Sequence, residues 1–318
     1  MPLYPEIAPY HQFQLPVGQG HTLYVEESGN RHGFPVVVLH GGPGGGCSGH
    51  LRRFFDPAFW RIILFDQRGA GRSTPAACVE HNSTDHLVAD IEAIRAKLGV
   101  DRWLVFGGSW GATLGLRYSQ NYPDHVAGAV LRGIFLCRDA DLAWLYAPGG
   151  ASRLRPEAWQ AFMAPLSASE QRQPLLAYHA RLHDGNNARS MDDARAWAGW
   201  EAACATLLPS ASVRSAFAER ALALARIETH YFINGGFLGQ PLLRGMSRMA
   251  AVPGIIVHGR YDLVCPADQA VALHQAWPGS ELCMVSSAGH SLAEPGIEAA
   301  LLRAVATMQA RLTGAEGA

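Results

Sequence analysis

An α/β fold with a mostly parallel, doubly wound sheet is the class that three features of this 318-residue sequence predict. Short apolar runs alternate with segments of helical periodicity in the early and late parts of the chain, as in parallel strands joined by helices. Several of these runs end directly in glycine-rich turns. A block of helical segments without clear strands, residues 138–245, interrupts the alternation. We therefore expect one sheet domain built from residues 1–137 and 246–318, with an inserted all-helical cap.

The composition restricts the classes of protein to consider. Apolar residues make up 48% of the chain and charged residues 17%, which is typical of a globular protein. A formal net charge of −1 gives no reason to expect nucleic acid or an anionic membrane as a partner. No apolar run has the length of a membrane span, and the first residues lack a signal-peptide pattern. The cysteines are scattered without a C-x-x-C motif, so we expect free thiols and a cytoplasmic location.

The chain begins with a predicted antiparallel hairpin. Residues 11–15 and 22–28 alternate apolar and polar side chains around a glycine-rich turn, which indicates two strands at a sheet edge. Residues 35–39 form a continuous apolar run rich in valine and predict a strand buried on both faces. A further strand is predicted at residues 60–65.

The remaining predicted elements alternate between helix and strand. A helix over residues 85–98 follows the candidate N-cap residues Ser83 and Thr84, and Gly99 is expected to end it. The other strands are predicted at 103–106, 126–131, 254–258 and 281–285, and the other helices at 112–118, 267–276 and 295–312.

The motif G-G-S-W-G at residues 107–111 joins a predicted strand directly to a predicted helix. Strand, G-x-S-x-G and helix in this order are the context of a nucleophile elbow. Glycines avoid clashes in so tight a turn, so the Ser109 hydroxyl would stand above the sheet. The backbone N–H of Trp110 would point to where an oxyanion could form. Because G-x-S-x-G is a weak signal by itself, a glycine-rich turn with an incidental serine stays open at this step.

A second glycine-rich stretch, H-G-G-P-G-G-G at residues 40–46, follows an early predicted strand. Its glycines free backbone N–H groups to face a ligand. A phosphate cradle is one interpretation, but no G-K-[S/T] follows, which excludes a P-loop. An H-G-G-type loop at this place supplies the second oxyanion donor in α/β-hydrolases. The alternative to a functional loop is a flexible loop without a role in binding or catalysis.

Three polar residues far apart in the sequence each follow a predicted strand: Ser109, Asp262 and His290. The carboxyl ends of parallel strands lie at one sheet edge, so these side chains can meet. Their order is the nucleophile, acid, histidine order of α/β-hydrolases. His290 would accept the serine proton, and Asp262 would orient the imidazole and stabilise its charged form. Taken singly, Asp262 could be a loop carboxylate and His290 a surface histidine, but their joint placement favours catalysis.

A metal site is the alternative considered for two other histidines. His179 and His183 lie four residues apart on a predicted cap helix and could share a metal ion. Ala180 stands where an H-E-x-x-H motif has its glutamate, and no third ligand is evident. We therefore favour a structural or solvent-facing pair and expect neither a metal nor a cofactor.

Five motifs occur together in this chain: H-G-G-P-G-G-G at 40–46, D-Q-R-G-A-G-R-S at 66–73, G-G-S-W-G at 107–111, G-R-Y-D at 259–262 and A-G-H-S at 288–291. Together they resemble the prolyl aminopeptidases (proline iminopeptidases), serine peptidases of the α/β-hydrolase fold. The resemblance runs from about residue 10 to residue 312. It implies an exopeptidase whose partner is a small peptide with a free N-terminal proline, and an acyl-enzyme intermediate on Ser109.

The resemblance also implies roles for individual positions. Ser109, Asp262 and His290 match the triad of the family, and Gly42 and Trp110 match its oxyanion donors.

Two cap glutamates of the family hold the charged imino group of the substrate. The segments W-A-G-W-E at 197–201 and I-E-T-H-Y-F at 227–232 resemble the segments that carry them. A cation that enters an apolar pocket must be paired, so two carboxylates there would select a free terminus. Cys265 matches a cysteine near the family's site, where thiol reagents could act without it being the nucleophile. The implied substrate-binding residues are Glu201, Glu228, Phe135, Tyr146 and Phe232.

Two other functions remain open from the sequence. The same site could serve a related α/β-hydrolase that cleaves small amides or esters. The fold could also carry a binding module without catalysis. The sequence sets neither the oligomeric state nor the volume of the pocket, because residues 147–196 are the part of the cap that matches the family least.

Overall fold

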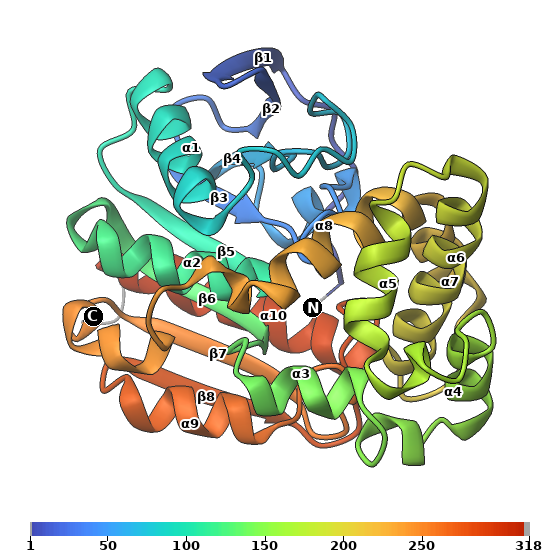
Figure 1. Ribbon diagram of the computed structural model, residues 1–318. Helices are drawn as coiled ribbons and strands as arrows, with labels where there is room; N and C mark the ends of the chain where they lie inside the picture. The colour runs from blue at the N-terminus through green and yellow to red at the C-terminus, as the bar shows by residue number, and fades with distance from the viewer. Residues whose placement is uncertain (1, 315–318) are drawn as a thin grey trace.

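Within residues 2–314, which the computed structural model describes apart from the side chain at position 187, eight strands form one central sheet (Figure 1). The strands are β1 (His11–Gly18), β2 (His21–Gly29), β3 (Phe34–Leu39), β4 (Trp60–Phe65), β5 (Trp103–Ser109), β6 (Val126–Ile134), β7 (Gly254–Gly259) and β8 (Ser280–Val285). Their order across the sheet is β1-β2-β4-β3-β5-β6-β7-β8. Strands β3 to β8 run parallel, whereas β1 and β2 form an antiparallel hairpin at one edge. The mostly parallel sheet and its edge hairpin are thus confirmed.

The central strands are buried on both faces because their side chains alternate between two apolar clusters. In β3, Val37 and Leu39 belong to one cluster, whereas Val36 and Val38 belong to the other. Successive side chains of a strand point to opposite faces, so a strand covered on both sides needs a continuous apolar run. This is why residues 35–39 could be recognised as a buried strand.

Helices cover both faces of the sheet, as expected for a doubly wound fold. The helices of the sheet domain are α1 (Thr84–Lys97), α2 (Trp110–Asn121), α9 (Asp268–Ala276) and α10 (Pro295–Leu312). On one face, α1, α2 and α9 contribute Ile91, Leu116 and Leu273 to the first apolar cluster. On the other face, α10 contributes Leu301 and Met308 to the second cluster.

Between β6 and β7 the described chain forms helices and no strand. These helices are α3 (Asp139–Tyr146), α4 (Pro156–Met163), α5 (Pro174–Leu182), α6 (Asn187–Cys204), α7 (Ala211–Glu219) and α8 (Ala221–Ile233). In Figure 1, α4 to α7 stand together beside the sheet, and α3 and α8 lie nearer to its strands. Phe162 stacks on Tyr178 with ring centroids 4.7 Å apart and lies 5.8 Å from the rings of Trp197 and Trp200. These buried rings give the helical block an apolar core of its own.

The connections carry short 3₁₀ helices: η1 (Gly49–Phe54), η2 (Pro123–His125), η3 (Ala151–Arg153), η4 (Glu170–Arg172), η5 (Gly235–Phe237) and η6 (Leu242–Met249). Crossing a bilayer requires a long, apolar helix. None of the helices within residues 2–314 meets that requirement.

The two ends of α1 differ in how well they were predicted. Ser83 is the N-cap residue as expected, but its hydroxyl is bonded to the side chain of His86 at 2.8 Å and to no backbone N–H of the described chain. At the other end, Gly99 adopts a φ of 61°, and the Val100 N–H donates to the Arg95 carbonyl at 3.1 Å. A glycine with positive φ just beyond the last turn is the usual helix stop, so this end is confirmed.

Candidate active site

The turn between β5 and α2 has the strained geometry of a nucleophile elbow. Ser109 has a φ of 58° and a ψ of −126°, a conformation that non-glycine residues rarely adopt. A Cβ at Gly107 would lie 2.4 Å from the carbonyl oxygen of Gly111, and a Cβ at Gly111 would lie 2.1 Å from that of Leu39. Both positions therefore require glycine, for the steric reason that the sequence suggested.

Asp262, just after β7, and His290, in the loop after β8, form a buried acid–base pair. The Nδ1 atom of His290 lies 2.7 Å from Oδ2 of Asp262, and Oδ1 accepts the backbone N–H groups of Val264 and Cys265 at 3.0 and 2.7 Å. Burial acts to raise the pKa of Asp262, but His290, His258 and the Cys265 backbone N–H together outweigh it and hold that pKa below its usual value. An ionised carboxylate only accepts, so Nδ1 carries the proton and Nε2 is left as the base.

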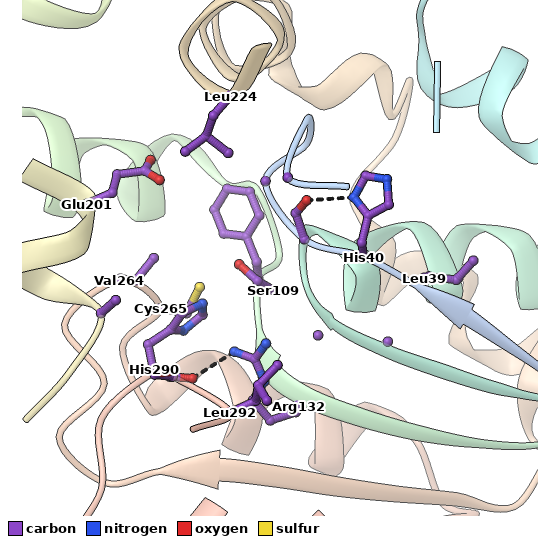
Figure 2. A pocket seen from close by; sticks show the side chains of 18 of the residues that line it. Leu39, His40, Ser109, Arg132, Glu201, Leu224, Val264, Cys265, His290 and Leu292 are labelled. Atoms are coloured by element: carbon purple, nitrogen blue, oxygen red, sulfur yellow. Dashed lines mark hydrogen bonds between the residues drawn. The ribbon is translucent and has the colours of Figure 1, made fainter. Parts of the chain in front are cut away.

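Ser109 and His290 line one cavity of about 250 Å³ at the carboxyl ends of the strands. Figure 2 shows the His290 ring on the sheet side of this cavity, Ser109 at its centre, and Glu201 and Leu224 reaching in from the helical side. Within the described chain, no hydrogen bond joins the Ser109 hydroxyl to His290. Hydrogen bonds of this kind are frequently long before substrate binds and tighten in the complex. The fold therefore brings the three distant residues to one site. The hydrogen bond between Ser109 and His290 is expected to form when substrate binds.

Gly133, at the carboxyl end of β6, lies close against the Asp262–His290 pair. Its φ is 55°, and a Cβ there would lie 2.9 Å from Cε1 and 3.0 Å from Nδ1 of His290. We expect Gly133→Ala to lower kcat by about 10- to 100-fold, because the imidazole must move to admit the methyl group. Steady-state kinetics on an N-terminal prolyl amide would measure it.

The matched control for that variant is Gly99→Ala. Gly99 has nearly the same φ, 61°, but a Cβ there would meet nothing within 4 Å. Both variants carry the same backbone strain, about 1–2 kcal/mol, and only Gly133→Ala adds a contact with His290. Equal kcat values for the two variants would show that Gly133 does not shape the site.

The predicted oxyanion donors are two backbone N–H groups in segments that meet at Ser109. The loop carrying Gly42 passes beside Ser109, since a Cβ at Gly41 would lie 3.3 Å from the Ser109 Cβ. Trp110 is the first residue of α2, and its N–H has no carbonyl partner within the helix. In the described chain, neither the Gly42 nor the Trp110 N–H donates to another backbone group. Gly42 lines the cavity, whereas the buried Trp110 side chain turns toward Gln67.

Glu201 of α6 and Glu228 of α8 both line the cavity and are almost fully buried. The Tyr146 hydroxyl donates to Oε1 of Glu201, and the Trp197 indole N–H donates to Oε2 of Glu228 at 2.6 Å. Burial raises the pKa of Glu201 to about 7. Burial and the charge of Glu201 raise the pKa of Glu228 well above its usual range. Both carboxyl groups are therefore harder to ionise than an exposed glutamate.

Aromatic rings from three elements form the apolar wall near these carboxylates. Phe135, Tyr146 and Phe232, the three predicted pocket residues, all line the cavity. The Phe232 ring lies 5.6 Å from that of Phe135 and 5.7 Å from that of Tyr146, centroid to centroid. Tyr146 also stacks on Trp197 at 4.5 Å, which fixes the hydroxyl that reaches Glu201. This side of the cavity thus combines apolar aromatic surface with the two buried carboxyl groups.

Sequence reasoning missed several residues of the site. The buried Arg132 guanidinium donates to the backbone carbonyl of His290 at 2.7 Å (Figure 2). Leu224 of α8 contributes apolar surface to the cavity, but a leucine on a helix gives no signal in the sequence. Cys265 lines the cavity as expected, and burial raises the pKa of its thiol well above its usual value, so thiol reagents should act on it slowly.

The two histidines considered as metal ligands lie outside this site. The rings of His179 and His183 pack together on α5 with centroids 4.4 Å apart. Nowhere in the described part of the chain do three side chains capable of binding a metal come together.

A parallel sheet, a nucleophile elbow after β5 and an Asp–His pair after the last two strands are the features of an α/β-hydrolase. A sequence profile of the family described as alpha/beta hydrolase fold matches residues 35–296. The chain therefore belongs to this class.

Close relatives define the family more narrowly. The chain is 51% identical over 306 residues to the proline iminopeptidase of Xanthomonas citri, covering 95% of this chain and 97% of that protein. It is 50% identical over 313 residues to the proline iminopeptidase of Arabidopsis thaliana, covering 97% and 82%. A crystal structure of the proline iminopeptidase of Mycobacterium smegmatis, 19% identical, matches with a TM-score of 0.62 over 95% of this chain and 100% of that chain, which supports the fold alone. Within the α/β-hydrolases, the chain belongs to the proline iminopeptidase family.

Proposed function

We propose that the protein is a serine exopeptidase that releases an N-terminal proline from peptides through an acyl-enzyme on Ser109. The single observation that carries the proposal is the buried pair Glu201 and Glu228, which shares one cavity with Ser109 and His290. A free imino terminus brings the positive charge that this pair lacks, whereas an internal peptide bond brings none. The names of the relatives support the same substrate class.

The proposed reaction begins when the prolyl ring packs against the aromatic wall and its charged nitrogen lies between Glu201 and Glu228. The Ser109 hydroxyl attacks the prolyl carbonyl carbon, and Nε2 of His290 accepts its proton. The N–H groups of Gly42 and Trp110 then stabilise the negative oxygen of the tetrahedral intermediate.

The second half of the reaction regenerates the enzyme. His290 donates its proton to the leaving amine, and the remaining peptide departs with a new amino terminus. Water then attacks the prolyl ester of Ser109 with His290 again as the base, and proline is released. Asp262 stays ionised throughout and stabilises the imidazolium.

A panel of X-β-naphthylamides tests the substrate class, with X as proline, hydroxyproline, alanine, leucine and N-acetylproline. We expect proline to be cleaved with the highest kcat/KM, and N-acetylproline to be cleaved at least about 100-fold less well, because it has no charge for the glutamates. Comparable hydrolysis of the blocked and free substrates would favour a general amidase or esterase instead.

The proposal includes the arrangement and location of the protein. Residues 138–245 act as a cap on the sheet domain formed by 1–137 and 246–318, and this cap supplies both glutamates. All six cysteines, which lie within the described residues, are free thiols, which supports a cytoplasmic location.

A further inference from the structure

Gln67, the second residue after β4, joins two segments that carry the predicted oxyanion donors. The residue is buried, with 2% of its surface exposed. Its Nε2 donates to the backbone carbonyl of His40 at 2.9 Å, and its Oε1 accepts from the indole Nε1 of Trp110 at 3.1 Å. One amide side chain therefore bridges the loop that carries Gly42 and the residue that follows Ser109.

The backbone of Gln67 makes the bridge more rigid through His40. The Gln67 N–H donates to Nε2 of His40 at 2.9 Å, so the other ring nitrogen, Nδ1, must carry the proton. That Nδ1 donates to the carbonyl oxygen of Gly41 at 2.9 Å (Figure 2). Burial lowers the pKa of His40, which keeps this neutral form. Gln67 thus contacts the loop in two ways. Its side chain binds the His40 carbonyl directly, and its backbone N–H reaches the Gly41 carbonyl through the His40 imidazole.

We propose that Gln67 is a positioning residue for the oxyanion hole, because it fixes the distance between the Gly42 and Trp110 N–H groups. Oxyanion donors act only when both lie about 2.7–3.1 Å from the oxygen that gains charge. The two donors come from different segments, one after β3 and one after β5, and the pairing of these strands ends at Leu39 and Gly107, before it reaches either donor. The proposal rests on acyl transfer at Ser109, as in the proposed function, but not on the preference for proline.

The test compares wild type with Gln67→Leu, which removes both side-chain bonds. We expect kcat for Pro-β-naphthylamide to fall by about 10- to 100-fold, less than for deletion of a donor, while KM changes by less than about twofold. Trp110→Phe removes only the indole bond and keeps the backbone N–H, so its kcat should fall by about 3- to 10-fold. If Gln67→Leu does not fold, Trp110→Phe is used to test the proposal instead.

Two inhibitors separate positioning from general loosening of the site. Prolinal, the aldehyde of proline, is attacked by the Ser109 oxygen, the hydroxyl proton passes to His290, and the aldehyde oxygen becomes the oxyanion. Pyrrolidine carries the ring and the charge but no carbonyl. We expect Gln67→Leu to weaken the binding of prolinal by the same factor by which it lowers kcat. The affinity for pyrrolidine should stay unchanged. An equal loss for both inhibitors, or an unchanged kcat in the folded variant, would overturn the proposal.

Gln120→Leu is the matched control for losing a buried glutamine. Gln120 lies on α2, where its Nε2 donates to the Leu242 carbonyl at 2.7 Å and its Oε1 accepts from Arg117 at 3.4 Å. We expect Gln120→Leu to lower the Tm but to leave kcat within about twofold, as structural changes remote from the chemistry do; an equal fall of kcat would count against the proposal. Hydrolysis of p-nitrophenyl acetate by all variants keeps the proposal testable if the wild type does not cleave prolyl substrates.

Discussion

Ser109→Ala is expected to lower the turnover of Pro-β-naphthylamide by about 10³-fold or more. The substitution removes the only atom that can form the acyl-enzyme and leaves the oxyanion donors and the glutamate pair in place. The backbone strain of the turn should not change, because alanine has the same Cβ as serine and the residue already has a φ of 58°. The fold should therefore remain and only the chemistry should be lost.

The measurement pairs kinetics with ligand binding. Pyrrolidine should bind the Ser109→Ala variant as it binds wild type, since its proposed contacts are to the glutamate pair and the aromatic wall. A fluorophosphonate should label wild type and not the variant, because it reacts with an activated serine. Equal turnover by the two proteins would refute Ser109 as the nucleophile, and failure of the wild type to react would favour a binding module without catalysis.

The elements of the sheet domain could be predicted because each is a strong local pattern. The strand at residues 60–65 and the helix at 295–312 match β4 and α10 to the residue. The Asp262–His290 contact followed from one non-local rule, that parallel strands end at the same sheet edge. That rule states which residues can meet, and it needs neither distances nor the strand order.

The contacts that refine the site could not be predicted, because they depend on the order of strands across the sheet. Gln67 reaches both His40 and Trp110 because β3 lies between β4 and β5. Gly133 lies under the acid–base pair because β6 is the neighbour of β7. A sequence without an alignment contains no signal for these neighbours.

The prediction of the two cap glutamates depended on the family resemblance for another reason. A glutamate on a helix is normally solvated, and nothing in the spacing of residues 197–201 and 227–232 shows that both turn inward. In the structure, α6 and α8 pack side by side and bury both carboxylates against aromatic rings. This burial disfavours the ionised form of both carboxyl groups, and for this reason we propose that the charged end of a substrate binds between them.

The replacement of both glutamates, Glu201→Gln with Glu228→Gln, is expected to lower kcat/KM for prolyl substrates by at least about 100-fold. Glutamine keeps an oxygen to accept from Tyr146 and Trp197, so the shape of the pocket is retained and only the charge is removed. Each single variant should lose less, because the remaining carboxylate no longer meets the charge of its neighbour and ionises more easily. Hydrolysis of p-nitrophenyl acetate, which carries no charge, should change by less than about threefold in all three variants.

Stability measurements distinguish this loss of binding from unfolding. The pKa of Glu201 is about 7 in the folded protein, against an ordinary value of 4.5. A raised pKa stabilises the folded state below about pH 4.5, and this contribution is lost as the pH rises through about 7. At pH 8 the free energy of unfolding of the double variant should therefore equal or exceed that of wild type. A much less stable double variant would mean that the carboxylates hold the cap together.

The same pKa values make binding of a cation depend on pH in a defined direction. Below about pH 7 Glu201 must release a proton when pyrrolidinium binds, so the affinity of wild type should rise with pH by up to about tenfold per unit as the pH approaches 7. Pyrrolidine itself remains protonated over this range, so the slope belongs to the protein. The double variant has no proton to release and should bind weakly with no slope. Calorimetry in two buffers of different ionisation enthalpy measures the released proton directly, and a flat profile for wild type would show that the pair is already ionised when the site is empty.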